Sequence, residues 1–163
     1  MKVWKYDQDS INTDMLFPGK YTYTCSTPED IRPHLLEDLD KDFAEKVEEG
    51  DVVMGGRNFG CGSSREQPVL GLKAVGIKAV IAKSFARIFY RSAINQGLLL
   101  IEAPDAVEYY KEGSDFAIDI DGGKIVIDDR TFTFPKLPPQ IMNIREPGGL
   151  LQYTREQLKK ERG

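Results

Sequence analysis

Cysteine and histidine are scarce in this chain: its 163 residues include two cysteines, Cys25 and Cys61, and one histidine, His34. Two cysteines that form no Cys-x-x-Cys pair cannot build a four-ligand metal site or hold an iron–sulfur cluster alone. A Ser-His-Asp triad would have to use His34, which lies in a charged stretch and which we expect at the surface. We therefore predict neither a metal site nor such a triad in this chain.

Long apolar runs and an excess of positive charge are also missing. The formal net charge of −4 gives no electrostatic support for nucleic-acid binding. No apolar run approaches membrane-spanning length, and the strand-like start, residues 1–6, lacks the apolar stretch of a signal peptide. We therefore expect a cytoplasmic protein that binds neither nucleic acid nor membrane. The length suits a single domain, residues 1–163, with a sizeable core.

The two cysteines have different surroundings. Cys25 lies in a polar segment, which predicts an exposed thiol that oxidises readily and could crosslink isolated chains into homo-oligomers. Cys61 lies in a glycine-rich loop, where it could act as a nucleophile. The interpretation that we favour for Cys61 is a small residue tolerated in a tight turn.

Residues 57–66, with the sequence RNFGCGSSRE, are the most informative segment. They follow an apolar strand, 52–54, and precede an apolar-periodic segment that predicts a helix from Ser64 to Val75. Two hydroxyls, of Ser63 and Ser64, and the guanidinium of Arg65 are thus predicted where a helix begins. Free backbone N–H groups and the helix dipole favour a carboxylate, a phosphate or a serine oxyanion there. An ordinary capping box, Ser63 with Glu66 or Ser64 with Gln67, is the alternative.

Three better-known loop motifs do not match. A Walker A loop would need lysine where Cys61 stands, and a Rossmann fingerprint would need glycine where Arg65 stands. The nucleophile elbow Gly-x-Ser-x-Gly fails because Ser64 is followed by Arg65 and Glu66.

Strands and helices alternate through the centre of the chain. Apolar runs at 52–54, 79–82 and 98–101 are separated by predicted helices at 64–75 and 85–96, which Gly76 and Gly97 end. This pattern predicts a parallel sheet covered on both faces, with the glycine-rich loop at the carboxyl end of its strand. Residues 31–49, before this region, are charged and helical in tendency.

The last third changes to the period of two that is typical of antiparallel strands. Residues 116–120 and 124–127 predict a hairpin, and residues 130–134 alternate again. Prolines then interrupt the chain, and residues 153–163 predict a charged helix. The fold class is therefore α/β, with a mixed, mostly parallel sheet flanked by helices.

Several of these segments together resemble a known family. Residues 60–66 (GCGSSRE) are similar to the signature of the aconitase superfamily's swivelling domain, and residues 82–88 (AKSFARI) follow at the expected distance. Residues 12–14 (NTD), ahead of residues 18–21 (PGKY), resemble the family's amino-terminal motif, and residues 95–98 (NQGL) extend the match. A free-standing chain of this length resembles the small subunits of 3-isopropylmalate dehydratases, and homoaconitase small subunits are closely similar.

The resemblance implies a swivelling β/β/α domain that works with a separate large subunit carrying a 4Fe-4S cluster. The reaction would isomerise a hydroxy acid with two or three carboxylates by dehydration and rehydration, as in leucine biosynthesis. Carried over by motif, Ser63 is the base, and Ser64 and Arg65 bind a substrate carboxylate. Asp14 matches an aspartate near the active site that orients other groups.

The chain departs from the family pattern in two places. Gln67 and Pro68 follow Arg65-Glu66, where many relatives have histidine. Relatives commonly place arginine just after the Pro-Gly-x-Tyr motif, whereas residues 21–26 contain none. We assign substrate selection to Tyr23 and Thr24, which could contact an isopropyl group or donate hydrogen bonds to a longer carboxylate. Isopropylmalate is the expected substrate. The alternatives are a homoaconitase small subunit, an enzyme that accepts both isopropylmalate and homocitrate-type substrates, and a non-catalytic anion-binding module on the same loop.

Overall fold

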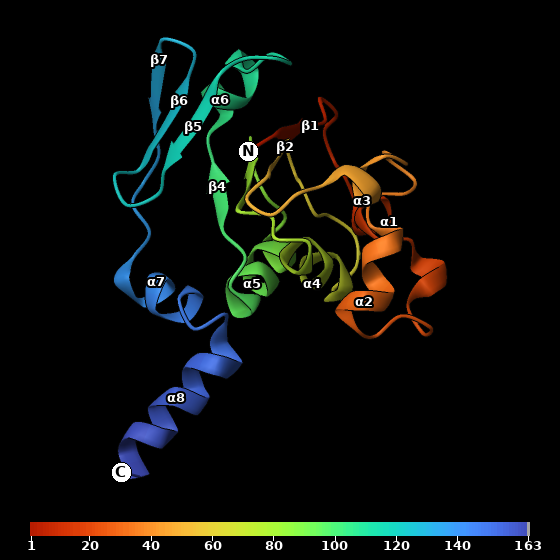
Figure 1. The fold of residues 1–163 in the computed structure, drawn as a ribbon, viewed down its shortest axis with the longest axis vertical. Helices are drawn as coiled ribbons and strands as arrows, with labels where there is room; N and C mark the ends of the chain where they lie inside the picture. The colour runs from red at the N-terminus through yellow and green to blue at the C-terminus, as the bar shows by residue number, and fades with distance from the viewer. Residues whose placement is uncertain (163) are drawn as a thin grey trace.

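The computed structural model describes residues 1–162 and contains two separate β-sheets (Figure 1). The parallel sheet has the strand order β1 (Val3–Lys5), β2 (Val52–Gly55), β3 (Ala79–Ala82) and β4 (Leu100–Glu102). The antiparallel sheet consists of β5 (Phe116–Asp119), β6 (Lys124–Ile127) and β7 (Arg130–Thr133). The α/β class and the hairpin are confirmed, and the two kinds of strand pairing lie in two sheets instead of one mixed sheet.

Helices connect and flank these strands. The longer ones are α4 (Gln67–Ala74), α5 (Arg87–Gln96) and α8 (Leu150–Arg162), and α8 projects from the rest of the chain (Figure 1). The shorter ones are α1 (Thr13–Leu16), η1 (Gly19–Tyr21), α2 (Pro28–Ile31), η2 (Arg32–His34), α3 (Phe43–Lys46), α6 (Pro104–Tyr109) and α7 (Pro139–Arg145). Within residues 1–162, no helix combines the length and the apolar character needed to span a membrane.

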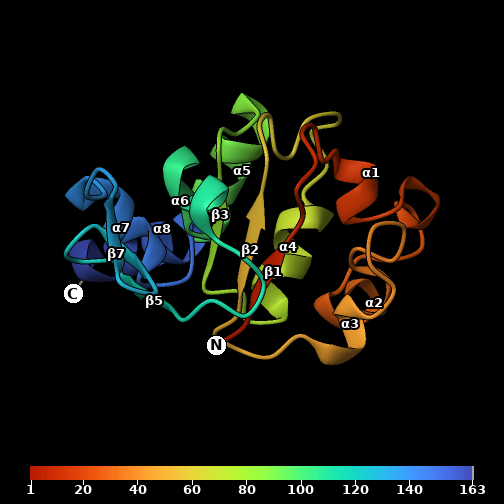
Figure 2. The ribbon, with the colours of Figure 1, turned by 90° about the horizontal axis from the view of Figure 1, so that it is seen from above.

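The two faces of the parallel sheet pack into two apolar clusters. One face buries alternate strand residues, such as Val53 and Val80, against the helices between Thr13 and Gln96. The opposite face buries Met54 and Ile81 against α6 and against the inward side chains of β6, including Ile125. Figure 2 shows α1 to α4 on one side of the sheet and α6 with the antiparallel sheet on the other. The predicted covering of both faces is therefore confirmed.

Helix α4 begins three residues later than its apolar periodicity predicts, at Gln67 instead of Ser64. The cause is Pro68. In a helix that began at Ser64, Pro68 would lie beyond the first turn, where its ring would meet a carbonyl and a hydrogen bond would be lost. In the observed helix it lies in the first turn, where its missing N–H group costs nothing. Glu66 is the N-cap residue and makes no side-chain cap, so neither predicted capping box forms.

Other expectations from the sequence were wrong in detail. Residues 31–49 form only short helices, because Pro33 lies in a 3-10 turn and Leu36 takes a left-handed backbone conformation (φ 56°). Helix α7 was missed, and α8 begins at Leu150 instead of residue 153. Cys25, which we expected to be exposed, is 7% exposed and packs into the apolar core, in a turn where its N–H group bonds back to Tyr21 O (3.0 Å).

A buried carboxylate, Asp51, joins β1 to the start of β2. It accepts hydrogen bonds from Lys2 N (2.6 Å), Trp4 Nε1 (3.0 Å) and Glu48 N (3.1 Å). Burial alone would raise the pKa of Asp51, but these hydrogen bonds hold the pKa below its ordinary value of 3.8. Ionised Asp51 is therefore part of what holds the edge strand in place.

We predict that Asp51→Ala lowers the free energy of unfolding by about 2–4 kcal/mol, because three donors lose their charged acceptor. Urea unfolding at pH 7 measures the loss, and Asp121→Ala, at an exposed position, is the control. The folded-state pKa is lowered, so this stabilisation is fully present above about pH 4 and disappears as the pH falls through the folded-state pKa. An equal loss in the two variants would contradict the role given to Asp51.

Candidate functional site

The glycine-rich loop lies at the carboxyl end of β2, and two parallel β-bridges fix its path. Asn12 pairs with Cys61, and Phe59 pairs with Phe85. The backbone N–H group of Gly60 also donates to Ile11 O (2.8 Å). Three segments that are far apart in the sequence, 10–14, 57–66 and 83–88, therefore meet at one edge of the sheet, as open parallel sheets commonly arrange their sites.

The segment after β3 holds the first half of the loop. Asn58 N donates to Ser84 Oγ (2.8 Å), and Phe59 N donates to Ser84 O (3.0 Å). The ring of Phe59 is fully buried and packs edge-to-face against Phe85 and Phe89. These contacts explain why the motif at 82–88 accompanies the loop. The motif holds the loop in place and does not supply its reactive groups.

Two glycines in the loop have backbone conformations and surroundings that exclude a side chain. Gly60 has φ +80°, and a Cβ atom there would come within 2.1 Å of the Phe89 ring. Gly62 has φ +111°, and its Cβ atom would lie 3.0 Å from Thr13 Oγ1. Both conformations are costly for residues with a side chain. The second glycine lets the chain approach Thr13 just before Ser63.

Ser63 is exposed, and its hydroxyl is held by two neighbours. Arg65 Nε donates to Ser63 Oγ (2.9 Å), and Thr13 Oγ1 lies 3.0 Å from the same oxygen. The backbone N–H group of Ser63 donates to Thr13 Oγ1 (3.1 Å). Because α4 begins only at Gln67, the positive potential at Ser63 Oγ comes from the guanidinium and not from the predicted helix N-terminus.

The guanidinium of Arg65 makes four hydrogen bonds to four different residues. Besides Ser63, it donates through Nη1 to Thr22 Oγ1 (3.0 Å) and Phe17 O (3.3 Å), and through Nη2 to Asp14 Oδ1 (2.5 Å). Arginine has five N–H groups, so one N–H group on Nη2 is left for another acceptor. Asp14 and Arg65, both predicted site residues, are thus brought together with Ser63.

Three further predicted residues, within residues 1–162, make no hydrogen bond to the side chains of Ser63, Arg65 or Asp14. Ser64 is exposed, and its side chain makes no hydrogen bond within residues 1–162. Tyr23 is 99% exposed, and Thr24 Oγ1 donates to Tyr21 O (3.3 Å) in its own turn. The substrate-binding roles assigned to all three stay predictions.

Glu37 contacts the segment 19–25, which carries Tyr23 and Thr24, through Lys20 and Tyr21. Glu37 forms an ion pair with Lys20 (2.8 Å) and a hydrogen bond with His34 Nδ1 (2.9 Å), and the ring of His34 stacks on Tyr21 at 3.7 Å between centroids. Burial alone would raise the pKa of Glu37, but hydrogen bonds from Lys20, His34 and Tyr21 lower it. The loop is therefore held by a charged cluster next to Arg65.

Two site residues, Thr13 and Thr22, were missed by the sequence analysis. Thr13 is 2% exposed, and Thr22 donates to Gly19 O (2.8 Å) while it accepts from Arg65. Both lie inside segments that were singled out, 12–14 and 21–26. Their polar side chains next to Asp14 and Tyr23 were the available signal, but only the fold shows which partners they meet.

Comparison with known proteins identifies the family of this chain. Residues 4–106 match the family model described as the aconitase C-terminal domain. The 3-isopropylmalate dehydratase small subunit of Thermodesulfovibrio yellowstonii is 42% identical over 98% of this chain and 95% of its own length. The protein of that name from Caldanaerobacter subterraneus is 46% identical over 97% of this chain and 98% of its own length. The chain belongs to the 3-isopropylmalate dehydratase small-subunit family.

A solved structure of this small-subunit family has the same fold. It is titled 3-isopropylmalate dehydratase, comes from Methanocaldococcus jannaschii, and is 42% identical, with a TM-score of 0.87 over 99% of this chain and 97% of that chain. The likeness covers nearly the whole length of both chains, including the antiparallel sheet and the C-terminal helices.

The residues of this small subunit do not fit an iron–sulfur cluster. Cys25 is buried in the core, whereas Cys61 lies in the glycine-rich loop with its Sγ directed at Ser10 O (3.5 Å). Such clusters need about four thiolate ligands. No group of three or more metal-ligating side chains gathers anywhere in residues 1–162. No chemical step is therefore assigned to a cluster held by this chain.

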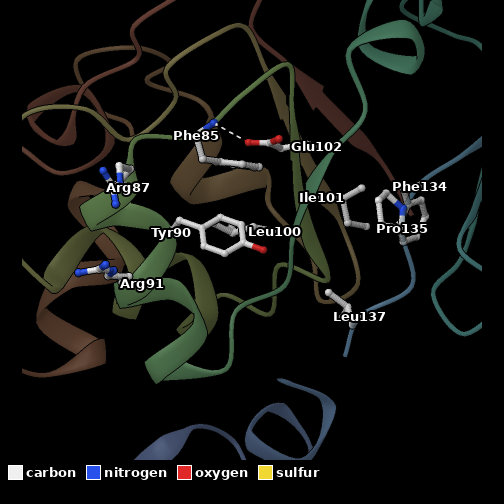
Figure 3. Close-up of a pocket in the computed structure, with 10 residues that line it drawn as sticks. All are labelled: Phe85, Arg87, Tyr90, Arg91, Leu100, Ile101, Glu102, Phe134, Pro135 and Leu137. Carbon is white, nitrogen blue, oxygen red and sulfur yellow. Dashed lines mark hydrogen bonds between the residues drawn. The ribbon is translucent and has the colours of Figure 1, made fainter. Parts of the chain in front are cut away.

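A cavity of about 380 Å³ lies elsewhere in the small subunit, between α5, β4 and the chain after β7. Figure 3 shows Tyr90 and Ile101 in its wall, and Phe85 N bonded to the carboxylate of Glu102 at one end. Arg91 points away from it (Figure 3). None of the candidate site residues lines this cavity, and Ser63 and Ser64 are exposed to solvent outside it.

We predict that Gly60→Ala destabilises the chain far more than Gly113→Ala. Both glycines have positive φ, but a Cβ atom at Gly113 meets nothing within 4 Å, whereas one at Gly60 meets the Phe89 ring. Gly113→Ala, the control, should lower the free energy of unfolding by about 1–2 kcal/mol through backbone strain. Gly60→Ala should lower it by about 2–5 kcal/mol through strain and overpacking. Urea unfolding measures both values, and equal losses would mean that the loop tolerates a side chain at Gly60.

Proposed function

We propose that this chain is the small subunit of a two-chain hydro-lyase that interconverts 2-isopropylmalate and 3-isopropylmalate by dehydration and rehydration, a step of leucine biosynthesis. The observation that carries the proposal is the hydroxyl of Ser63, which is exposed and accepts a hydrogen bond from Arg65 Nε (2.9 Å). Relatives of nearly the same length, at 42–46% identity, carry the name of this enzyme. Their names do not favour the homoaconitase alternative.

Ser63 acts as the base in this proposal. A proton next to a carboxylate is weakly acidic, and serine can accept it only as the alkoxide, so the alkoxide must be stabilised. Arg65 Nε is already in contact with Ser63 Oγ, so positive charge is in place before any proton moves. Asp14 holds the guanidinium, while Ser64 and the remaining N–H group of Arg65 bind a carboxylate of the substrate.

A large subunit completes the site. Ser63 and Ser64 lie exposed at an open surface, whereas proton abstraction by a serine needs water to be excluded. The large subunit would cover this surface, and the 4Fe-4S cluster that we expect it to carry supplies a Lewis acid for the substrate's hydroxyl. The small subunit alone is therefore inactive. Because Cys25 is buried, the disulfide route to homo-oligomers loses its support. A cytoplasmic location is part of the proposal.

The decisive test is anaerobic reconstitution with the large subunit encoded in the same genome. Ser63→Ala should lower kcat on 2-isopropylmalate by several orders of magnitude with complex formation intact, because it removes the base. Ser114→Ala, outside the site, is the matched control and should keep full activity. A Ser63→Ala complex that is as active as the wild type would reject the proposal in favour of a non-catalytic anion-binding module.

Substrate choice is predicted to depend on Tyr23 and Thr24. Replacing both by alanine should change the ratio of kcat/KM for isopropylmalate to that for homocitrate-series substrates by about tenfold, since one lost side-chain contact is worth about 1–3 kcal/mol. Thr131→Ala, exposed on β7, is the control. If the ratio stays the same, the assignment of the selecting loop is wrong, whatever happens to the absolute rates.

A further inference from the structure

Thr13 is the buried polar residue at the site that the proposed chemistry has not yet used. It is the first residue of α1 and is 2% exposed. Its backbone N–H group donates to Cys61 O (2.8 Å), and Asn12 caps the same helix by accepting from Met15 N (2.9 Å). Thr13 is thus held against the glycine-rich loop by backbone contacts that do not involve its hydroxyl.

The hydroxyl of Thr13 faces Ser63 alone. Its oxygen accepts the N–H group of Ser63 (3.1 Å) and lies 3.0 Å from Ser63 Oγ. A hydroxyl has one proton to donate. Within residues 1–162, Ser63 Oγ is the one acceptor in hydrogen-bond range of that proton. When Ser63 is ionised it has no proton of its own, so the bond between the two oxygens then runs from Thr13 to Ser63.

Resting on the function proposed above, we propose that Thr13 is a positioning residue that donates a hydrogen bond to the Ser63 alkoxide. Arg65 Nε supplies the second donor, at 2.9 Å. An alkoxide oxygen has three lone pairs, so two donors leave one lone pair for the substrate's proton. Thr13 lies on the buried side of Ser63, which leaves the exposed side open for the substrate.

The proton balance of this arrangement is simple. Ser63 Oγ takes the proton from the carbon next to the substrate's carboxylate, and the electron pair of that bond stays on the substrate. In the reverse direction Ser63 returns the same proton. The hydroxyl of Thr13 keeps its proton throughout and only strengthens or weakens its hydrogen bond as Ser63 changes charge.

Three variants of Thr13, each reconstituted with the large subunit, test this role. Thr13→Val keeps the shape of the buried side chain and removes the hydroxyl, and Thr13→Ser keeps the hydroxyl. Loss of one donor to an oxyanion typically costs about 10²–10³-fold in kcat. We expect that loss in Thr13→Val with KM within about threefold of the wild type, and rescue to within about tenfold by Thr13→Ser. Thr13→Ala should match Thr13→Val.

The outcomes separate this role from a structural one and from failure of the proposed function. If Thr13→Val does not fold, the serine and alanine variants differ by one oxygen atom and give the same comparison. Equal kcat for the serine and alanine variants, or a loss seen only in KM or in assembly, would overturn the role of Thr13. A wild-type complex without turnover, or a fully active Ser63→Ala complex, would instead overturn the hydro-lyase proposal.

Discussion

The guanidinium of Arg65 joins segments of the chain that lie far apart in the sequence. Through Asp14 and Phe17 it holds α1 and the turn after it, through Thr22 it holds the loop that carries Tyr23, and through Nε it holds Ser63. Only a rigid, forked donor reaches four acceptors in these directions, so a lysine could not replace it. Asp14 is largely exposed, and an exposed ion pair of this kind contributes about 0–1 kcal/mol to stability. The main contribution of Arg65 is therefore to position the residues that it binds, and not to stabilise the fold.

The site depends on a rigid sheet because its own segments are short and irregular. Helix α1 has four residues, and the path of the glycine-rich loop requires left-handed backbone conformations at Gly60 and Gly62. Isolated segments of this kind would not keep their shape in water. The buried strands beneath them, together with the Ser84 anchor and the Phe59 ring, supply the order that the local sequence lacks.

The parts of the fold that follow from periodicity were predictable from the sequence. The apolar run at 79–82 and the alternating segment at 124–127 became β3 and β6, and the glycines after α4 and α5 end those helices with left-handed conformations. The start of α4 was predicted three residues too early, at Ser64, because Pro68 excludes residues 64–66 from the helix. The burial of Cys25 could not be predicted, since a polar local sequence says nothing about which way a turn folds.

The residues of the candidate site also fall into those that the sequence indicated and those that only the fold revealed. The sequence motifs indicated Ser63, Arg65 and Asp14, which the structure brings into one hydrogen-bonded group. The contacts of Thr13 and Thr22 arise from tertiary pairing of residues about 45 positions apart, which no local pattern encodes.

Under the proposed function, the exposure of Ser63 accounts for the need for a second chain. Hydrogen bonds from Arg65 and Thr13 to an oxyanion are weak in water and become much stronger in a dry site of low dielectric constant. The small subunit has these donors already in position around Ser63 Oγ, so no rearrangement of its own chain is needed to stabilise an alkoxide of Ser63. A partner that covers the surface would raise the strength of both hydrogen bonds at once. Under the proposed function, assembly would therefore favour the alkoxide of Ser63, and a second chain would be needed for the ionisation of the serine as well as for the cluster.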